Sequence, residues 1–220
     1  MQVPTMIRFD DARKLMVASQ LRPSGVNDPR VIEAMARVPR EAFVPVDRKA
    51  MAYSDRPIPL IAGREMNAPL ITGRLLTELR VTATDRVLLI GAATGYGAAL
   101  LAALARHVTA VEEQPALAEM ARATLANFPN VDVIESRLAA GHGAGAPYDV
   151  VMIDGAVERI PQTVVGQMAD GGRLGAGLIE DAVCRLVLGR RIGAAFGTSA
   201  FEDGDAVMLP GFARAPAFSF

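Results

Sequence analysis

A glycine-rich turn is the first part of this sequence whose residue types and spacing could support chemistry. The residues GAATGYG occupy positions 91–97, directly after the apolar run VLLI at 87–90. Glycine at a turn between a buried strand and a helix lets the backbone approach a ligand that a Cβ atom would block. The N-terminus of the following helix directs N–H groups at the same place. We therefore expect Gly91 and Gly95 to lie against a bound ligand.

The carboxylate of Glu112 fits the same kind of site. Glu112 follows the second apolar run, at 108–111, and lies about 20 residues beyond the turn. In a parallel sheet, an acid at this position can accept hydrogen bonds from the two hydroxyls of a ribose. The turn and the acid together indicate a cofactor that contains a nucleoside. The competing interpretation is a turn that only packs a helix against a strand, with Glu112 in solvent.

Two classes of enzyme agree with this turn. Its glycine spacing, G-x-x-x-G-x-G, resembles the turn of the short-chain dehydrogenases, whose chemistry uses a Tyr-x-x-x-Lys pair downstream. Lys14 and Lys49 are the only lysines, so no lysine follows the turn. The other class binds S-adenosylmethionine, whose sulfonium group makes methyl transfer possible without a metal. The position of the lysines favours this second class.

The composition limits the partners of the chain. Its 220 residues carry 23 Lys and Arg against 24 Asp and Glu, a net charge of -1. Nucleic acids and anionic membranes usually select a basic surplus, so neither is an expected partner. One cysteine, Cys184, and two histidines cannot alone form a Cys/His zinc site, and we expect no metal. Without a secretory signal or a long apolar run, a cytoplasmic protein is expected.

The elements before the turn are expected to be helices and loops. Asn27-Asp28-Pro29 is typical of a helix start, and Pro39 ends the apolar helical face that follows. Three prolines and a glycine exclude a long helix from 53–69, so we expect an ordered loop or edge segment there. Helical spacing resumes at 70–80.

From residue 85 onward, apolar runs alternate with helical patterns. We expect strands at 87–90, 108–111, 131–134 and 148–153, and helices at 98–106, 115–127 and 160–169. This alternation predicts an α/β fold with a mostly parallel, doubly wound sheet. Residues 183–209 are expected to add two or three strands, with turns at Gly197 and Asp203-Gly204. Asp154 follows the fourth strand, where such a sheet opens its binding crevice.

Several longer segments resemble one protein family. They are QLRPSGVNDPRVIEAMARVPREAFVP (20–45), AYSDRPIPL (52–60), VLLIGAATGYGAALLAAL (87–104), HVTAVEEQPALAEMAR (107–122), PYDVVMID (147–154) and GGRL (171–174). In this order they resemble the protein-L-isoaspartate O-methyltransferase family over nearly the whole chain. The resemblance implies a Rossmann-like methyltransferase fold, S-adenosyl-L-methionine as cofactor, and repair of isoaspartyl residues in damaged proteins by carboxyl methylation.

The resemblance also implies an organisation and a set of cofactor contacts. We expect one domain, 1–220, with N-terminal helices and a substrate loop at 1–80, a cofactor-binding core at 81–180, and C-terminal strands and a tail at 181–220. The positions that match the family's cofactor motifs are Gly91, Gly95, Tyr96 and Glu112.

Other positions depart from the family's usual pattern. The segment 63–69 reads GREMNAP where the family usually has GQTISQP, so Asn67 replaces a serine. Leu89 stands where the first strand usually carries an acid, and Ala93 replaces a glycine of the turn. The usual Gly-Asp-Gly after the third strand is replaced by Ser136-Arg137-Leu138, so the acid on the adenine side is missing.

These changes leave a plausible set of catalytic residues. An isoaspartyl carboxylate is ionised at neutral pH, so its methylation needs orientation and not a general base. We expect the loop at 57–69 to lie over the cofactor, with Asn67 nearest the transferred methyl group and orienting the acceptor. Arg64, where it points inward, can clamp the acceptor carboxylate through two hydrogen bonds. Otherwise Arg64 pairs with Glu65 or faces solvent.

The expected partners are peptides or proteins that carry isoaspartyl residues. The alternative is a divergent family member with weakened or lost catalysis, either in a regulatory role or redirected to another acceptor. The sequence does not indicate an oligomeric state.

Overall fold

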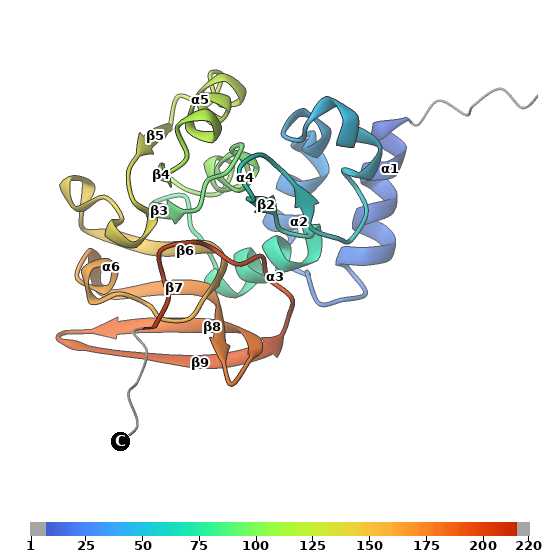
Figure 1. Ribbon diagram of the computed structural model, residues 1–220. Coiled ribbons are helices and arrows are strands. Elements are labelled where there is room, and N and C mark those ends of the chain that lie inside the picture. Colours follow the sequence, from blue (N-terminus) through green and yellow to red (C-terminus); the bar gives the residue numbers. More distant parts are fainter. Residues whose placement is uncertain (1–7, 215–220) are drawn as a thin grey trace, which may run out of the picture.

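A seven-stranded sheet runs through the middle of the molecule in a computed structural model, which describes residues 8–214 (Figure 1). Its strands lie in the order β5-β4-β3-β6-β7-β8-β9. They are β3 (Arg86–Ile90), β4 (His107–Glu112), β5 (Val131–Glu135), β6 (Tyr148–Val157), β7 (Met168–Glu180), β8 (Val183–Ile192) and β9 (Ala195–Asp203). Pairing is parallel from β5 to β7 and antiparallel from β7 to β9. The predicted α/β fold with a mostly parallel sheet is therefore confirmed.

The strand that leads to the glycine-rich turn, β3, is buried on both faces. Val87, Leu88, Leu89 and Ile90 have no exposed surface. Val87 and Leu89 belong to one hydrophobic cluster, while Leu88 and Ile90 belong to a second. Successive side chains of a strand point to opposite faces, so an unbroken apolar run suits a strand that is covered on both sides.

The two faces of the sheet are covered differently. One is covered by α3 (Pro69–Leu79), α4 (Tyr96–Ala102) and α5 (Pro115–Thr124), each of which contributes buried residues to the first cluster. The other is covered by α6 (Gln162–Val165), by the 3-10 turns Leu138–Ala140 and Gly143–Gly145, and by the segment after β9. This last segment, dark red in Figure 1, runs along β6, where the Leu209 N–H donates to the Ala156 carbonyl at 2.9 Å.

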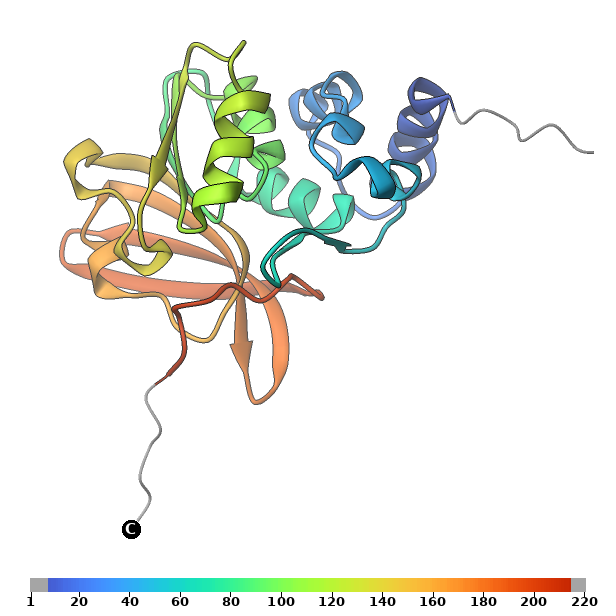
Figure 2. The same cartoon turned by 45° about the horizontal axis from the view of Figure 1, so that its top comes forward.

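The N-terminal helices form a further layer beside α3 and α4 (Figure 2). α1 (Phe9–Met16) continues as a π-helical turn (Val17–Leu21), and α2 (Pro29–Arg37) and the 3-10 turns Arg40–Ala42 and Val46–Met51 follow. α2 begins as predicted, because the Asp28 side chain accepts a hydrogen bond from the Arg30 N–H at 2.9 Å. It contacts both α3 and α4, which joins this layer to the sheet.

A small hairpin connects the N-terminal layer to α3. β1 (Ile58–Pro59) pairs antiparallel with β2 (Glu65–Met66), with Ile58 opposite Met66. Both of these side chains are buried, and they attach the base of the hairpin to the core. The ordered segment predicted at 53–69 is therefore confirmed.

Two predictions for the second half of the chain are wrong. The helix expected at 160–169 covers only Gln162–Val165, and Met168 already belongs to β7, opposite Tyr148. A short apolar run does not distinguish a buried strand from a helix by periodicity, and here pairing with β6 decides. The turn expected at Gly197 lies instead at Gly193, whose φ is +57°. Gly197 is inside β9, the exposed edge strand, where it pairs with Arg190.

Within residues 8–214, no helix is long and apolar enough to cross a membrane.

Candidate active site

The glycine-rich turn connects β3 to α4 with three residues at positive φ, two glycines and Ala93, whose φ is +49°. Gly91 has a φ of +86° and Gly95 a φ of +100°, conformations that glycine adopts at little cost. The N–H groups of Gly91 and Ala92 both donate to the carbonyl of Val111 at 3.0 Å. The first amides of the turn therefore hold β4 in place and are not free for a ligand.

The space over both glycines is filled by side chains of this protein. A Cβ atom on Gly91 would lie 2.9 Å from Cδ1 of Leu209 and 3.7 Å from Nη2 of Arg64. A Cβ atom on Gly95 would lie 2.8 Å from Cδ1 of Leu125, just beyond α5. Gly95 therefore serves close packing of the turn, and Gly91 lies beneath Leu209 and Arg64.

The carboxylate of Glu112 is fully buried at the end of β4. It accepts hydrogen bonds from the backbone N–H groups of Ala93 at 2.8 Å, Gln114 at 3.0 Å and Glu113 at 3.1 Å. Its fourth partner is Arg64, whose Nη1 lies 2.5 Å from Oε1. A Glu112 side chain in solvent is therefore excluded.

Arg64 reaches Glu112 from the hairpin, 48 positions away in the sequence. Only 4% of the Arg64 side chain is exposed, whereas the neighbouring Glu65 is exposed. The alternative in which Arg64 pairs with Glu65 or faces solvent is excluded, because the guanidinium turns inward to the buried carboxylate of Glu112; the predicted role as a clamp for the acceptor stays a prediction. The structure joins a predicted catalytic residue and a predicted cofactor residue in one ion pair.

Asn67 lies at the start of α3 and is held from two sides. Its Nδ2 donates to Oδ1 of Asp154 at 2.8 Å, and its Oδ1 accepts from the Val207 N–H at 2.8 Å. Thr72 donates a longer hydrogen bond to the same Asp154 oxygen, at 3.4 Å. Burial raises the pKa of Asp154, and the hydrogen bonds from Asn67 and Thr72 and the charges of nearby arginines oppose that change.

A buried arginine that the sequence reasoning missed completes this cluster. Arg40 has no exposed surface, and its guanidinium donates to the carbonyls of Ala52 at 2.8 Å and Asn67 at 2.5 Å. It lies 4.7 Å from the ring centre of Tyr96, which also packs edge-on against Phe43. Burial lowers the pKa of Arg40 and raises that of Tyr96. The available signal was a lone arginine between apolar and proline residues at 38–45.

Several buried donors near this cluster have no partner, and one of them, Tyr96, lines a very small cavity. Within the described part of the chain, the buried atoms Arg40 Nη1, Arg64 Nε, Arg64 Nη2 and Tyr96 OH have no hydrogen-bond partner. The cavity between Asn67, Asp154 and the glycine-rich turn measures about 10 Å³, which is room for about one water molecule. Donors without acceptors in such a place are suited to an anionic or polar ligand.

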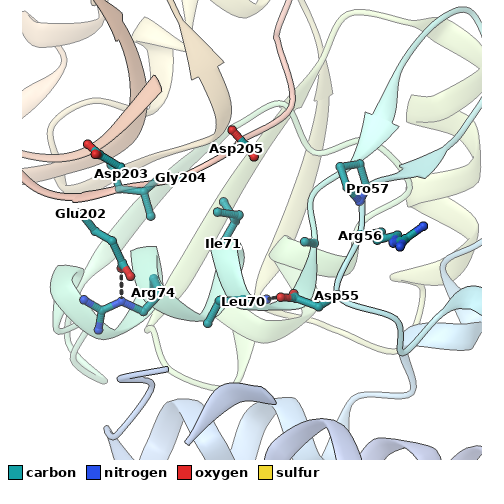
Figure 3. A pocket seen from close by; sticks show the side chains of 12 residues that line it. Asp55, Arg56, Pro57, Leu70, Ile71, Arg74, Glu202, Asp203, Gly204 and Asp205 are labelled. Atoms are coloured by element: carbon teal, nitrogen blue, oxygen red, sulfur yellow. Dashed lines mark hydrogen bonds and ion pairs between the residues drawn. The ribbon is translucent and has the colours of Figure 1, made fainter. Parts of the chain in front are cut away.

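A larger cavity opens on the other side of the Asn67-Ala68 peptide. It measures about 380 Å³ and lies between residues 55–57, the start of α3 and residues 202–205 (Figure 3). Arg74 pairs with Glu202 at 2.5 Å in its wall, and Asp55 accepts from the Leu70 N–H at 3.2 Å. Asp203 and Asp205 also border it. Across residues 8–214, no group of three or more His, Cys, Asp or Glu side chains could hold a metal ion.

Comparison with known families decides the classification. The family model for protein-L-isoaspartate(D-aspartate) O-methyltransferase matches residues 12–187. The chain belongs to this family. A protein-L-isoaspartate O-methyltransferase from Herpetosiphon aurantiacus is 40% identical over 168 residues, which cover 76% of this chain and 75% of that protein. One from Rhodopseudomonas palustris is 42% identical over 161 residues, covering 72% of this chain and 74% of the relative.

Solved structures agree with the methyltransferase fold. A protein-L-isoaspartate O-methyltransferase structure matches with a TM-score of 0.78 at 19% identity, covering 93% of this chain and 66% of that one. A second structure, from Plasmodium falciparum, is described as a putative enzyme of this kind in complex with S-adenosyl-L-homocysteine. It matches with a TM-score of 0.77 at 16% identity, and the match covers 93% of this chain and 99% of that one. The family and fold predicted from the sequence motifs are confirmed, and this family member is a methyltransferase.

Proposed function

We propose that this methyltransferase transfers the methyl group of S-adenosyl-L-methionine to the side-chain carboxylate of isoaspartyl residues in damaged proteins or peptides. The observation that carries the proposal is the family match over residues 12–187. The alternative of a family member without turnover is not favoured by the relatives, which are named for this activity. The cytoplasm is our proposed compartment.

The residues present fit the cofactor in their chemistry. The buried carboxylate of Glu112 is suited to ribose hydroxyls, and the free donors Arg40 Nη1 and Tyr96 OH are suited to the carboxylate of an amino-acid group. When bound, the cofactor supplies a methyl group on a positively charged sulfur. Room for it requires movement of Arg64 and Leu209, which lie over Gly91.

Asn67 is suited to orient the acceptor. One N–H of its amide is used by Asp154 and its oxygen by the Val207 N–H, so the amide plane is fixed while its second N–H remains for a carboxylate. Because the acceptor is ionised at neutral pH, no side chain has to remove a proton from it.

The larger cavity is our candidate for the peptide that flanks the acceptor. It borders Ala68, the residue after Asn67, and its volume of about 380 Å³ lies within the usual range for ligand sites. Its wall combines apolar residues such as Pro57 and Ile71 with the acids Asp203 and Asp205. A peptide with basic residues beside the isoaspartyl group would suit these acids.

The decisive experiment is a radiolabelled methyl-transfer assay with an isoaspartyl peptide and its normal aspartyl counterpart. We expect label on the isoaspartyl peptide and little on the aspartyl one. Equal labelling of both peptides, or none of either with cofactor present, would reject isoaspartyl repair.

A further inference from the structure

The tip of the β1–β2 hairpin is attached to the protein by Arg64 and by Leu60, which is partly buried and packs against the core. Ile61, Ala62 and Gly63 are exposed, and a Cβ atom on Gly63 would meet no atom within 4 Å. Ala62 and Gly63 both have positive φ, at +53° and +72°. Arg64 is the buried residue of the tip, with 4% of its side chain exposed. The Arg64–Glu112 ion pair is therefore the polar attachment of the tip to the sheet.

The guanidinium of Arg64 does not make all of its possible hydrogen bonds in this attachment. Arg64 uses Nη1 toward Glu112, but its buried Nε and Nη2 have no partner. Buried donors without acceptors are unfavourable, so the closed hairpin is poised to exchange Arg64 for a ligand that satisfies the site better.

Glu112 keeps its place without Arg64. Three backbone N–H groups, from Ala93, Glu113 and Gln114, hold its carboxylate independently of the hairpin. Departure of Arg64 would remove one donor from Oε1, which would still accept from the Glu113 and Gln114 N–H groups, and would leave an oriented carboxylate without a cationic partner. The same departure would remove one of the two side chains over Gly91, since Arg64 Nη2 lies 3.7 Å from where a Gly91 Cβ would be, while Leu209 at 2.9 Å would still cover it.

We propose, on the basis of the function proposed above, that Arg64 is an internal competitor for the cofactor. Its guanidinium occupies the carboxylate of Glu112 that the ribose would bind, and the hairpin tip moves away before the cofactor enters. The observed affinity is then the intrinsic affinity reduced by the fraction of molecules with an open hairpin. A hairpin closed in about 90% of molecules lowers the affinity about tenfold.

The test is calorimetric titration of the full chain with S-adenosyl-L-homocysteine, in the wild type and in Arg64→Gln. We expect Arg64→Gln to bind about tenfold more tightly, because the neutral amide competes poorly for a carboxylate. Arg37→Gln is the matched control, since Arg37 is exposed, pairs with Glu33 at 2.7 Å and lies outside the site. It should bind as the wild type does.

Amide hydrogen exchange without ligand gives a second readout. The Leu60 N–H donates to the Arg64 carbonyl at 2.8 Å and the Arg64 N–H to the Ile61 carbonyl at 3.0 Å. We expect both amides to exchange faster in Arg64→Gln and to be unchanged in Arg37→Gln. Arg64→Met, which is as long as the glutamine variant but leaves no polar group to bury, replaces Arg64→Gln if that variant does not fold.

The outcomes separate the competitor from the function. If Arg64→Gln binds S-adenosyl-L-homocysteine no more tightly than the wild type, and the wild type methylates the isoaspartyl peptide, Arg64 is not a competitor but the proposed function stands. Absence of both binding and methylation in every variant overturns the function and the competitor with it. If neither variant folds, amide hydrogen exchange of the wild type is compared with and without S-adenosyl-L-homocysteine. If the ligand leaves the exchange rates at residues 60–64 unchanged, the proposal is overturned.

Discussion

At the scale of single residues, the side-chain amide of Asn67 is held by a partner on each side. It satisfies Asp154 on one side and the Val207 N–H on the other, and it has 1% of its surface exposed. A residue in this place has little freedom to change its direction. If Asn67 orients the acceptor, its substitution should affect turnover more than cofactor binding.

We predict that Asn67→Leu lowers turnover about 10- to 100-fold, the loss expected for an orienting hydrogen bond to a charged acceptor. Asn67→Ser, which restores the usual family residue, should keep or raise methylation of an isoaspartyl peptide. The measurement is kcat beside the dissociation constant of S-adenosyl-L-homocysteine, with urea unfolding to confirm that each variant is folded. An Asn67→Leu variant that methylates as fast as the parent would remove Asn67 from the mechanism.

The second residue-scale prediction concerns Asp154. Burial raises the pKa of Asp154 in the folded protein above the ordinary value of 3.8, which applies to the unfolded chain. At a pH between the unfolded and the folded pKa, the native chain therefore binds more protons than the unfolded chain. Hydrogen bonds from Asn67 and Thr72 and the positive charges of Arg40 and Arg64 oppose this change. The wild type should therefore lose stability as pH rises from about 4 toward the native pKa.

Asp154→Asn, which keeps an oxygen for the Asn67 amide, should not show this loss. The difference in free energy of unfolding between Asp154→Asn and the wild type should shift in favour of the variant as pH increases. It should become constant above the native pKa of Asp154. Urea unfolding of both proteins from about pH 4 to pH 8 measures this difference. Parallel pH profiles would mean that Asp154 has an ordinary pKa.

Residues close to strand ends could be predicted from the sequence, whereas contacts across the chain could not. Gly91 and Glu112 follow apolar runs, and parallel pairing necessarily brings the ends of β3 and β4 together. The partner of Glu112 could not be found in this way, because Arg64 belongs to a hairpin whose direction depends on tertiary packing. The contact of Arg40 with Tyr96 has the same origin. The catalytic and cofactor roles assigned to these residues stay predictions.

At the scale of elements, the hydrophobic pattern predicted the buried parallel strands correctly. It predicted the boundaries of elements after residue 160 less well. β3 and β4 contain short unbroken apolar runs, as a strand covered on both faces requires. The apolar residues Val164, Val165 and Met168 fit a helix as well as a strand, and pairing of Met168 with Tyr148 determines the outcome. In β9 an edge position tolerates Gly197, which the sequence alone indicates as a turn.

The prediction at this scale compares two glycines with positive φ. Gly95→Ala should destabilise the protein by about 1–2 kcal/mol through the left-handed backbone. The Cβ contact with Leu125 at 2.8 Å should add about 1–3 kcal/mol of overpacking. Gly63→Ala, with a φ of +72° but nothing near its Cβ, should cost only the backbone contribution. Urea unfolding measures both, and equal losses would contradict the packing role of Gly95.

At the scale of the whole molecule, the single-domain organisation of 1–220 stays a prediction that unfolding can test. α2 contacts α3 and α4, so the N-terminal layer and the sheet should unfold together. Tyr53 belongs to the N-terminal layer and Tyr148 to the sheet, and both tyrosines are buried. Urea transitions followed by tyrosine fluorescence and by far-UV circular dichroism should coincide. Two separate midpoints would indicate two independently stable units.

The segment after β9 has a consequence for how the protein is made. Synthesis proceeds from the N-terminus, so a nascent chain extended to Asp203 already contains all strands described for residues 8–214. It still lacks Val207, whose N–H fixes Asn67, and Leu209, which lies over Gly91. A premature stop codon in this short stretch would therefore yield a polypeptide with a complete sheet and an unfinished active site.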